Sequence, residues 1–260
     1  MRFDNHIIWI TGASSGIGEA LAIAWSREGA TLVLSARNAA ELERVRTLCA
    51  SPNRHVIKPL DLADLASIER TAADVLRELG RVDILVHSGG VSQRSLAAET
   101  DLATDRRIMD INYFGTVALT KAVLPSMIAR GAGHIVPISS VIGYVGVPLR
   151  SAYSASKHAL HGFFETLRAE TAKHGIVVTI VVPGYIRTNV SENALRGDGS
   201  RYGTMDETHQ RAMLPDVAAP KIIDAVAKKK PEMRVGGKEI WAVPLRRLFP
   251  GVLRRVMRMR

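Results

Sequence analysis

HIIWITGASSGIGEALAIAWSREG, residues 6–29, places a short apolar run, a glycine-rich turn and a helical pattern in direct succession. Gly12, Gly16 and Gly18 allow the chain to turn tightly and let its backbone approach a ligand closely. The turn leads straight into a helix, whose first N–H groups lack partners and favour an anion such as a pyrophosphate. The stretch therefore predicts the first strand, turn and helix of a dinucleotide-binding fold, and a turn with only a structural role is the alternative.

Six more β-rich runs follow this stretch, and helical patterns separate them. The seven runs read HIIWIT, TLVLSA, HVIKPL, DILVHS, HIVPIS, IVVTIVV and, more weakly, EMRVG. Helix starts are also readable at Asn38, which stands ahead of Glu41 as in a capping box, and at Asp64. The alternation predicts an α/β fold: a single doubly wound, Rossmann-type parallel sheet of about seven strands with helices on both faces.

The composition fits one globular domain and excludes several classes of protein. The 260 residues are 47% hydrophobic and 23% charged, as in an ordinary globular chain. Cys49 is the only cysteine, so neither an intrachain disulfide nor a cysteine-based metal site can form, and we expect no metal. Neither a signal sequence nor a membrane-spanning run is readable, which predicts a cytoplasmic protein. Much of the net charge of +10 lies near the C-terminus without a nucleic-acid-reading motif, so we expect no nucleic acid partner.

The end of the second predicted strand indicates which dinucleotide the fold would bind. NAD sites usually carry an acid there to hold the ribose 2′-hydroxyl, whereas a basic residue suits a 2′-phosphate. The stretch VLSARN has Ala36 in the place of the acid and Arg37 beside it. We therefore expect NADP(H) rather than NAD(H), and the alternative for Arg37 is a solvated surface side chain.

A second motif, YSASK, places Tyr153 and Lys157 four residues apart ahead of an apolar helical run. Positions i and i+4 share one face of a helix, so the phenol and the ammonium can point into the same space. An ammonium nearby favours the phenolate and lowers the pKa of the phenol, which would let Tyr153 act as a general acid or base. A polar helix face with no chemical role is the alternative for this pair taken alone.

The two motifs, with the spacing T-G-x-x-x-G-x-G in Thr11–Gly18, resemble the short-chain dehydrogenase/reductase family over about residues 5–240. The resemblance implies a catalytic set of Asn112, Ser140, Tyr153 and Lys157, with Ser139 as a less favoured alternative to Ser140. In that family Tyr153 would exchange a proton with the substrate oxygen, and Lys157 would lower the tyrosine pKa and bind the nicotinamide ribose. Ser140 would polarise the carbonyl. Asn112 would hold a helix irregularity and a water in a proton path to the lysine, unless it is only a satisfied core asparagine.

The resemblance also implies a cofactor site, and it includes one departure. The implied residues are Gly12, Ser14, Ser15, Gly16, Ile17, Gly18, Arg37, Asp61, Leu62, Gly90, Tyr153, Lys157, Pro183, Gly184, Ile186 and Thr188. Asp61 would lie near the adenine, or would serve only as a turn residue. Where most relatives read Asn-Asn-Ala-Gly after the fourth strand, this chain reads HSGG, so His87 and Ser88 replace the asparagines and Gly90 is kept. Contacts at His87 and Ser88 are therefore expected to differ from the family pattern.

The function that these residues imply is an NADP(H)-dependent oxidoreductase that interconverts a carbonyl and a secondary alcohol, the activity of a carbonyl reductase. A nucleotide-binding sensor or scaffold without turnover is the alternative, and a sugar-nucleotide epimerase is a third. The stretches NYFGTVALTKA and GDGSRYGTMDET resemble membrane-associated steroid- and retinoid-type members, which implies an apolar substrate. Relatives pair through the two long helices around Asn112 and Tyr153, so we expect a homodimer or homotetramer.

The chain is expected to divide into a catalytic domain at 1–244 and a basic tail at 245–260. A segment at about 189–215, rich in Gly, Ser, Asp and Arg, predicts a mobile substrate lid that shares specificity with side chains near Ser92 and Tyr185. In the tail, LRRLFPGVLRRVMRMR, six arginines and no acids accompany an apolar stripe of Leu245, Leu248, Phe249, Val252, Leu253, Val256 and Met257. Peripheral contact with a membrane and packing of the stripe on protein are equally favoured.

Overall fold

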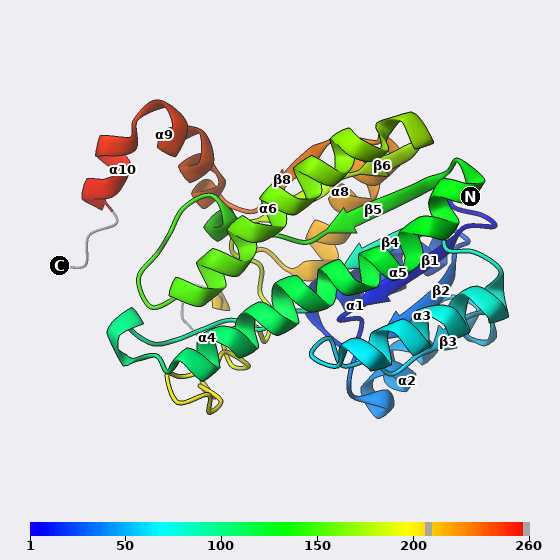
Figure 1. The fold of residues 1–260 in the computed structure, drawn as a ribbon, viewed down its shortest axis with the longest axis horizontal. Helices are drawn as coiled ribbons and strands as arrows, with labels where there is room; N and C mark the ends of the chain where they lie inside the picture. The colour runs from blue at the N-terminus through cyan, green and yellow to red at the C-terminus, as the bar shows by residue number, and fades with distance from the viewer. Residues whose placement is uncertain (206–209, 257–260) are drawn as a thin grey trace.

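The computed structural model describes residues 1–205 and 210–256, and Figure 1 shows a central sheet with helices on both of its faces. The strands are β1 (Ile7–Thr11), β2 (Thr31–Ser35), β3 (Val56–Ile57), β4 (Ile84–His87), β5 (Gly133–Pro137), β6 (Ile176–Val178), β7 (Ile180–Pro183) and β8 (Glu232–Val235). The α-helices are α1 (Gly16–Arg27), α2 (Ala39–Leu48), α3 (Leu65–Leu79), α4 (Leu102–Met109), α5 (Gly115–Arg130), α6 (Ser151–Thr171), α8 (Pro215–Ala227), α9 (Ala242–Leu248) and α10 (Pro250–Val256).

All seven predicted strand segments are found, and every pairing between them is parallel among the described residues. One sheet has the order β3-β2-β1-β4-β5-β6, and β7 pairs with β8 beside it. The order reverses at β1, where β2 lies on one side and β4 on the other, as in a doubly wound sheet. The predicted α/β, Rossmann-type fold is therefore confirmed.

The sixth predicted run, IVVTIVV, differs from expectation because it divides into β6 and β7 at Thr179. The Thr179 N–H donates to the Ile135 carbonyl at 3.0 Å, whereas the next N–H, of Ile180, donates to the Pro231 carbonyl at 3.1 Å. The Thr179 hydroxyl also donates to the Lys230 carbonyl at 2.6 Å. The chain thus changes partner from β5 to β8 at this residue, and a parallel bridge between Ile138 and Val181 keeps the two sheets adjacent.

Two hydrophobic cores lie on the opposite faces of the sheet, because successive side chains of a strand point to opposite sides. In β1, Ile8 and Ile10 pack against α1, α2 and α8, whereas Trp9 between them packs against α3, α5 and α6. The indole N–H of Trp9 is satisfied by the Ser35 hydroxyl at 2.8 Å. Since both faces are covered, ligands can reach the sheet only at its edges, and the carboxyl ends of parallel strands are the usual place.

The two predicted helix starts are confirmed. The Asn38 side chain accepts hydrogen bonds from the N–H groups of Ala40 and Glu41 at 3.0 and 3.2 Å, at the start of α2. The Asp64 carboxylate accepts from Ser67 N–H at 3.0 Å, at the start of α3. The Glu41 carboxylate does not complete a capping box, because it binds Arg44 at 2.8 Å.

The segments predicted as lid and tail are partly described. Residues 206–209 of the lid and Met257 of the apolar stripe lie outside the described residues. Within 189–205 the chain is paired to the loop after β4, because Leu195 N–H donates to the Ser92 carbonyl at 2.9 Å and Arg94 N–H donates to the Leu195 carbonyl at 2.7 Å. In the tail, α9 and α10 form two short helices that join at Phe249 and Pro250. None of the described helices is long and apolar enough to cross a membrane.

Candidate active site

The glycine-rich turn lies at the carboxyl end of β1, where the backbones of two strand exits approach each other. Gly12 has φ +66°, and a Cβ built there would lie 2.6 Å from the backbone nitrogen of Gly89 in the loop after β4. A Cβ at Gly18 would overlap the Gly12 carbonyl oxygen. Only glycine fits both positions, because any side chain would separate β1 from α1 and from the β4 exit.

The start of α1 forms a cradle that suits a pyrophosphate. The N-cap residue Ser15 makes no side-chain hydrogen bond to the first turn within the described part of the chain, so those N–H groups remain available to an anion. A Cβ at Gly16, which has φ +58°, would lie 2.9 Å from Thr188 Cγ2, so Thr188 from the loop after β7 closes the cradle. The predicted residues of the turn and Thr188 are therefore brought together, and the shape and donors of the cradle fit a dinucleotide.

Three of the predicted residues, Arg37, Asp61 and Leu62, lie at the adenosine end of the predicted cofactor site. Arg37 is exposed directly after β2 and Leu62 is buried beside Gly89. Asp61 Oδ1 accepts from Ala63 N–H at 3.0 Å, which is the turn role that the sequence offered as an alternative. Arg44 was not predicted: its guanidinium binds Glu19 at 2.8 Å and donates to the Ser14 carbonyl at 3.3 Å, so it anchors the glycine-rich turn to α2.

The predicted catalytic side chains converge at the carboxyl end of β5. Ser140 caps a short 3₁₀ turn, Val141–Gly143, and its side chain lies close enough to Tyr153 of α6 to lower the pKa of the phenol. Lys157 lies one turn further along α6, with its Nζ 5.7 Å from the centroid of the Tyr153 ring. The Lys157 ammonium is buried and donates to the Ile138 carbonyl at 2.9 Å. Two hydroxyls and one ammonium thus face a common space, as the i, i+4 spacing predicts.

The electrostatics of this group differ from the expectation in one respect. Burial raises the pKa of the Tyr153 hydroxyl above its ordinary value, and the opposing influences are the Arg150 guanidinium and the Ser140 side chain. Burial also lowers the pKa of Lys157 to about 8, because a low-dielectric surrounding penalises the charged ammonium. Arg150, three residues before the tyrosine, is thus a cation that favours the phenolate and that the sequence did not single out.

Asn112 occupies the helix irregularity that the resemblance implied. Asp110–Phe114 form a π-helical turn between α4 and α5. Within it the Asn112 side chain accepts from Val91 N–H at 2.8 Å and donates to the Val91 carbonyl at 2.9 Å and to the Ser156 hydroxyl at 3.0 Å. A Cβ at Gly90 would lie 3.0 Å from Asn112 Oδ1 and 3.8 Å from Lys157 Nζ, so all three meet at the β4 exit. Asn112 thereby joins the β4 loop to α6.

The nicotinamide end predicted from PGYIRT lies at the exit of β7. Gly184 N–H donates to the Val235 carbonyl at 2.8 Å, and Ile186 is buried in a bridge with Met213. Glu239 was missed: its Oε1 accepts from Tyr185 N–H at 2.7 Å and from Gly237 N–H at 2.8 Å, and so fixes the turn after Pro183. A cavity of about 340 Å³ opens beside this turn. Its lining residues are Tyr185, Arg211, Ala212, Met213, Gly237 and Glu239.

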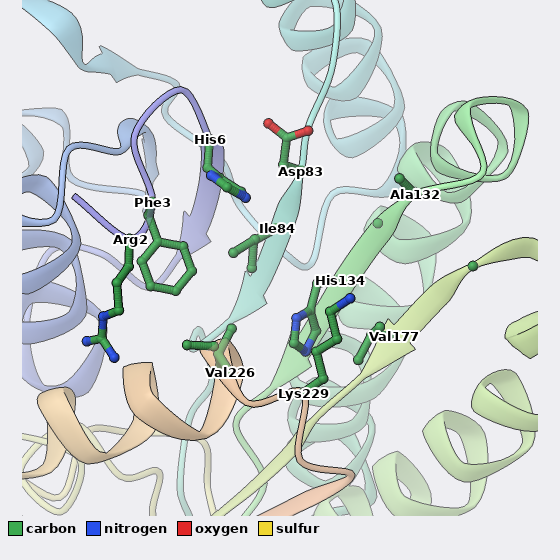
Figure 2. A pocket seen from close by; sticks show the side chains of 13 residues that line it. Arg2, Phe3, His6, Asp83, Ile84, Ala132, His134, Val177, Val226 and Lys229 are labelled. Carbon is green, nitrogen blue, oxygen red and sulfur yellow. The ribbon is translucent and has the colours of Figure 1, made fainter.

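A larger cavity, of about 480 Å³, lies at the opposite edge of the sheet (Figure 2). Its lining includes His6 ahead of β1, Asp83 ahead of β4 and His134 at the start of β5, which are all at the amino ends of the strands. Asp83 is held by Ile7 N–H at 2.8 Å and by Arg130 at 2.9 Å. We assign this cavity no catalytic role, because the predicted chemical groups lie at the carboxyl ends. No group of three or more metal-ligating side chains occurs in residues 1–205 and 210–256.

Gln93 is a further residue that the sequence did not reveal. It is fully buried in the loop after β4, and its Oε1 accepts from Ala152 N–H, in the first turn of α6, at 2.8 Å. Its Nε2 donates to the hydroxyls of Thr100 and Ser151 at 2.9 and 3.1 Å. The side chain of Arg150, the N-cap residue of α6, makes no capping bond to the described residues of that helix. Gln93 therefore caps the helix that carries Tyr153 and Lys157 from a distant part of the chain.

Replacing Gln93 by Met is expected to lower the free energy of unfolding by about 2–3 kcal/mol, because buried donors and acceptors lose their partner. Urea unfolding followed by circular dichroism measures the change. Asn38→Ala, which removes the exposed cap of α2, provides the comparison and should cost about 1 kcal/mol. Equal stability of Gln93→Met and the unchanged chain would show that the α6 cap contributes nothing.

Comparison with known proteins agrees with this arrangement. A family model described as short chain dehydrogenase matches residues 6–198. A dehydrogenase/reductase SDR family protein 7-like of Drosophila melanogaster is 46% identical over 257 residues, which cover 96% of this chain and 79% of that protein. The crystal structure of a short-chain dehydrogenase from Streptomyces avermitilis is similar with a TM-score of 0.83 and 35% identity, covering 96% of this chain and 94% of that one.

A metagenomic short-chain oxidoreductase solved in complex with NADP has a TM-score of 0.75 and 28% identity, covering 90% of this chain and 98% of that one. Among the similar structures some hold NADP and one holds NAD. The family match spans the glycine-rich turn, the π-helical turn at Asn112 and the Ser140, Tyr153 and Lys157 group. The chain belongs to the short-chain dehydrogenase/reductase family of oxidoreductases.

Proposed function

We propose that this chain is an NADP(H)-dependent oxidoreductase that interconverts a carbonyl and a secondary alcohol, with Tyr153 as the proton donor and acceptor. The observation that carries the proposal is the grouping of Tyr153 with the Ser140 side chain and the buried Lys157 ammonium at the carboxyl edge of the sheet. A structural tyrosine needs neither a serine nor a lysine partner. The grouping supports proton transfer to an oxygen atom placed between the two hydroxyls.

The residues at the carboxyl edge of the sheet would have separate roles in cofactor binding and in proton transfer. The turn of Gly12–Gly18, with Thr188, would hold the pyrophosphate, and Pro183, Gly184 and Ile186 would line the nicotinamide end. The nicotinamide supplies or accepts the hydride. In the reducing direction Ser140 donates a hydrogen bond to the carbonyl oxygen and Tyr153 gives it a proton; in the oxidising direction Tyr153 takes the alcohol proton. Lys157, held by the Ile138 carbonyl, keeps a positive charge near the phenolate that forms.

The preference for NADP(H) over NAD(H) rests on Arg37. Arg37 is exposed after β2, and position 36 is an alanine instead of the acid that is usual in NAD sites. The Arg37 guanidinium could therefore bind a ribose 2′-phosphate at this place. Arg44 adds a second guanidinium close to the glycine-rich turn, although Glu19 and Glu41 already neutralise it. Similar structures hold either cofactor, so the proposal depends on these residues and not on the fold.

Arg37→Ala is expected to weaken NADPH binding by about 10- to 100-fold, since a charge-assisted hydrogen bond to the 2′-phosphate is lost. NADH lacks that phosphate, so its affinity should stay the same. Fluorescence titration of both cofactors measures the two dissociation constants. Arg77→Ala, on the exposed face of α3, serves as the control for a lost surface charge. An unchanged NADPH affinity in Arg37→Ala would mean that Arg37 is only a solvated side chain.

The substrate is proposed to be an apolar carbonyl compound or alcohol. The cavity of about 340 Å³ beside Tyr185 and the segment 189–205, which pairs with the loop at Ser92, lie where substrate specificity was expected. The first experiment is a titration with NADPH and NADH, followed by a panel of carbonyl compounds monitored for cofactor oxidation. Turnover of any panel member supports the enzyme, whereas tight NADPH binding without turnover of any carbonyl or alcohol favours a nucleotide sensor.

We also propose a cytoplasmic homodimer or homotetramer that pairs through α5 and α6. Those helices cover one face of the sheet, and Phe114, directly before α5, is 49% exposed. Burial of such a side chain between two copies would remove apolar surface from water. Light scattering at micromolar concentration tests the assembly, and a monodisperse monomer would refute it.

A further inference from the structure

The C-terminal helices α9 and α10 expose a set of large apolar side chains. Trp241, directly before α9, is 70% exposed, and Leu248, Phe249 and Val252 are 68%, 58% and 54% exposed. We call these four side chains the apolar patch. Leu253 from the same predicted stripe is 7% exposed and packs inward. The stripe therefore divides: one part holds the tail to the domain, and the other part is left facing solvent.

The patch lies at the active-site end of the molecule. Figure 1 shows α9 and α10 projecting beyond the sheet on the side toward which β5 runs. Arg246 in α9 lies 3.1 Å from His158 Nε2, and His158 follows Lys157 directly in α6. Val243 in α9 is buried and belongs to the core on the α6 side of the sheet. The apolar patch is thus carried by helices that are anchored next to the catalytic group.

The surroundings of the apolar patch are strongly basic. Residues 240–260 contain six arginines and neither an aspartate nor a glutamate. Arg246, Arg247 and Arg255 are all exposed on α9 and α10. A short amphipathic segment with aromatic side chains on one side and arginines beside them has the chemistry of a segment that lies in the headgroup layer of an anionic bilayer.

We propose that the apolar patch and its neighbouring arginines dock the protein on an anionic lipid bilayer, parallel to its surface. The apolar side chains enter the layer between headgroups and acyl chains, and the arginines bind lipid phosphates. A second copy of the chain fits this surface poorly. In a two-fold dimer the same patch meets itself, so arginines would face arginines with no acid in the segment to pair with them.

Docking in this orientation would place the proposed active site near the bilayer. It brings the carboxyl edge of the sheet close to the lipid, because α9 contacts α6 beside Lys157. An apolar substrate dissolved in the bilayer would then have a short path to Tyr153. This consequence rests on the proposed function, whereas the docking itself does not, and vesicle binding can be measured without any turnover.

Tryptophan fluorescence provides a direct test with the full chain. The protein has three tryptophans, of which Trp9 and Trp25 are fully buried, so a change in emission on mixing with vesicles reports Trp241. Vesicles of phosphatidylcholine alone are compared with vesicles that also contain phosphatidylglycerol. We expect a blue shift of the emission only with the anionic vesicles, and its reversal by added salt.

Two sets of variants separate the contributions of charge and apolar surface, with flotation of the vesicles as the readout. Arg247→Gln with Arg255→Gln should weaken partitioning into anionic vesicles by about 30-fold, because each arginine near the surface contributes about fivefold. Leu248→Ser with Phe249→Ser should abolish the blue shift of Trp241. The matched controls lie at the other end of the molecule, on α2 and α3. They are Arg70→Gln with Arg77→Gln, and Leu48→Ser with Leu65→Ser.

The proposal is overturned if vesicle binding is absent or is equal for the two lipid compositions. It is also overturned if binding falls as much in the control variants as in the tail variants. A further contradicting result is that Leu248→Ser with Phe249→Ser lowers the molecular mass in light scattering while the unchanged protein does not bind vesicles. The apolar patch would then be a contact between copies of the chain.

Discussion

Turnover of a carbonyl substrate with NADPH is expected to fall by about 10²- to 10⁴-fold when Tyr153 is replaced by Phe. The substitution removes one oxygen atom, and with it the only group of the site that is proposed to give a proton to the substrate. The aromatic ring, Lys157 and the glycine-rich turn stay in place. Binding of NADPH should therefore be retained, and stopped assays of kcat beside a fluorescence titration separate the two effects.

Tyr113→Phe is a matched control for this result. Tyr113 is a half-buried tyrosine in the π-helical turn, and its ring packs edge-on against Phe163 with the centroids 6.3 Å apart. Loss of its hydroxyl should leave kcat unchanged. If Tyr153→Phe turned over like the unchanged enzyme, the proton would have to come from another group and the proposed role of Tyr153 would be wrong.

As the pH is lowered from 6.5 to about 4, the free energy of unfolding is expected to fall, by up to about 4 kcal/mol for each pH unit near the middle of this range. The cause is buried histidines that are neutral in the fold: burial lowers the pKa of His55, and more strongly that of three others. Burial lowers the pKa of His87 to about 3, with the Lys157 charge as a smaller cause, and lowers the pKa of His134 and of His161 to about 4. Each contributes about 1.4 kcal/mol per pH unit.

The free energy of unfolding falls with decreasing pH because the unfolded chain binds more protons than the folded chain. The ordinary pKa of histidine is 6.5, so below this pH the unfolded chain takes up protons while the folded chain does not until about pH 4. Acid therefore favours the unfolded chain throughout this window. More than about one pH unit above 6.5 the histidines are neutral in both states and contribute almost no slope. Urea unfolding at a series of pH values measures the dependence.

His87→Asn should reduce this slope by up to about 1.4 kcal/mol per pH unit, since one buried neutral histidine is removed. His87 Nε2 lies 2.8 Å from the Thr120 hydroxyl, which itself donates to the Thr116 carbonyl at 2.8 Å, so His87 donates to Thr120. Asn38→Ala, which removes no titratable group, is the control and should leave the slope unchanged. A stability that does not vary between pH 6.5 and 4 would contradict the assignment of neutral buried histidines.

The sequence predicted the fold because its strongest signals are local. Gly12 and Gly18 permit backbone contacts that no other residue allows, and the structure places them against Gly89 and against each other. The spacing of Tyr153 and Lys157 fixes their common face wherever a helix forms. Asn112 was noticed because asparagine is a poor residue for a helix interior, and it lies in a π-helical turn. Each of these inferences needed only neighbours within a few residues.

The tertiary structure alone decided which distant groups meet. Gln93 caps α6 at Ala152, 59 residues away, and Glu239 fixes the turn at Tyr185, 54 residues away, although neither belongs to a recognisable motif. The contribution of Arg150 to the charge that favours the Tyr153 phenolate depends on the direction that its side chain takes in the packed site. The division of the tail stripe into a buried Leu253 and an exposed Phe249 depends on which side faces the domain.

The sequence by itself thus determined the order of strands and helices along the chain, the glycine-rich turn and the residue types that we propose to be catalytic. Periodicity and the steric needs of turns act between near neighbours in the chain. Burial, long-range hydrogen bonds and the pKa values of side chains depend on the dielectric and the partners that only the assembled fold supplies. For this reason the helix cap at Gln93, the neutral state of His87 and the apolar patch next to the active site were decided by tertiary structure.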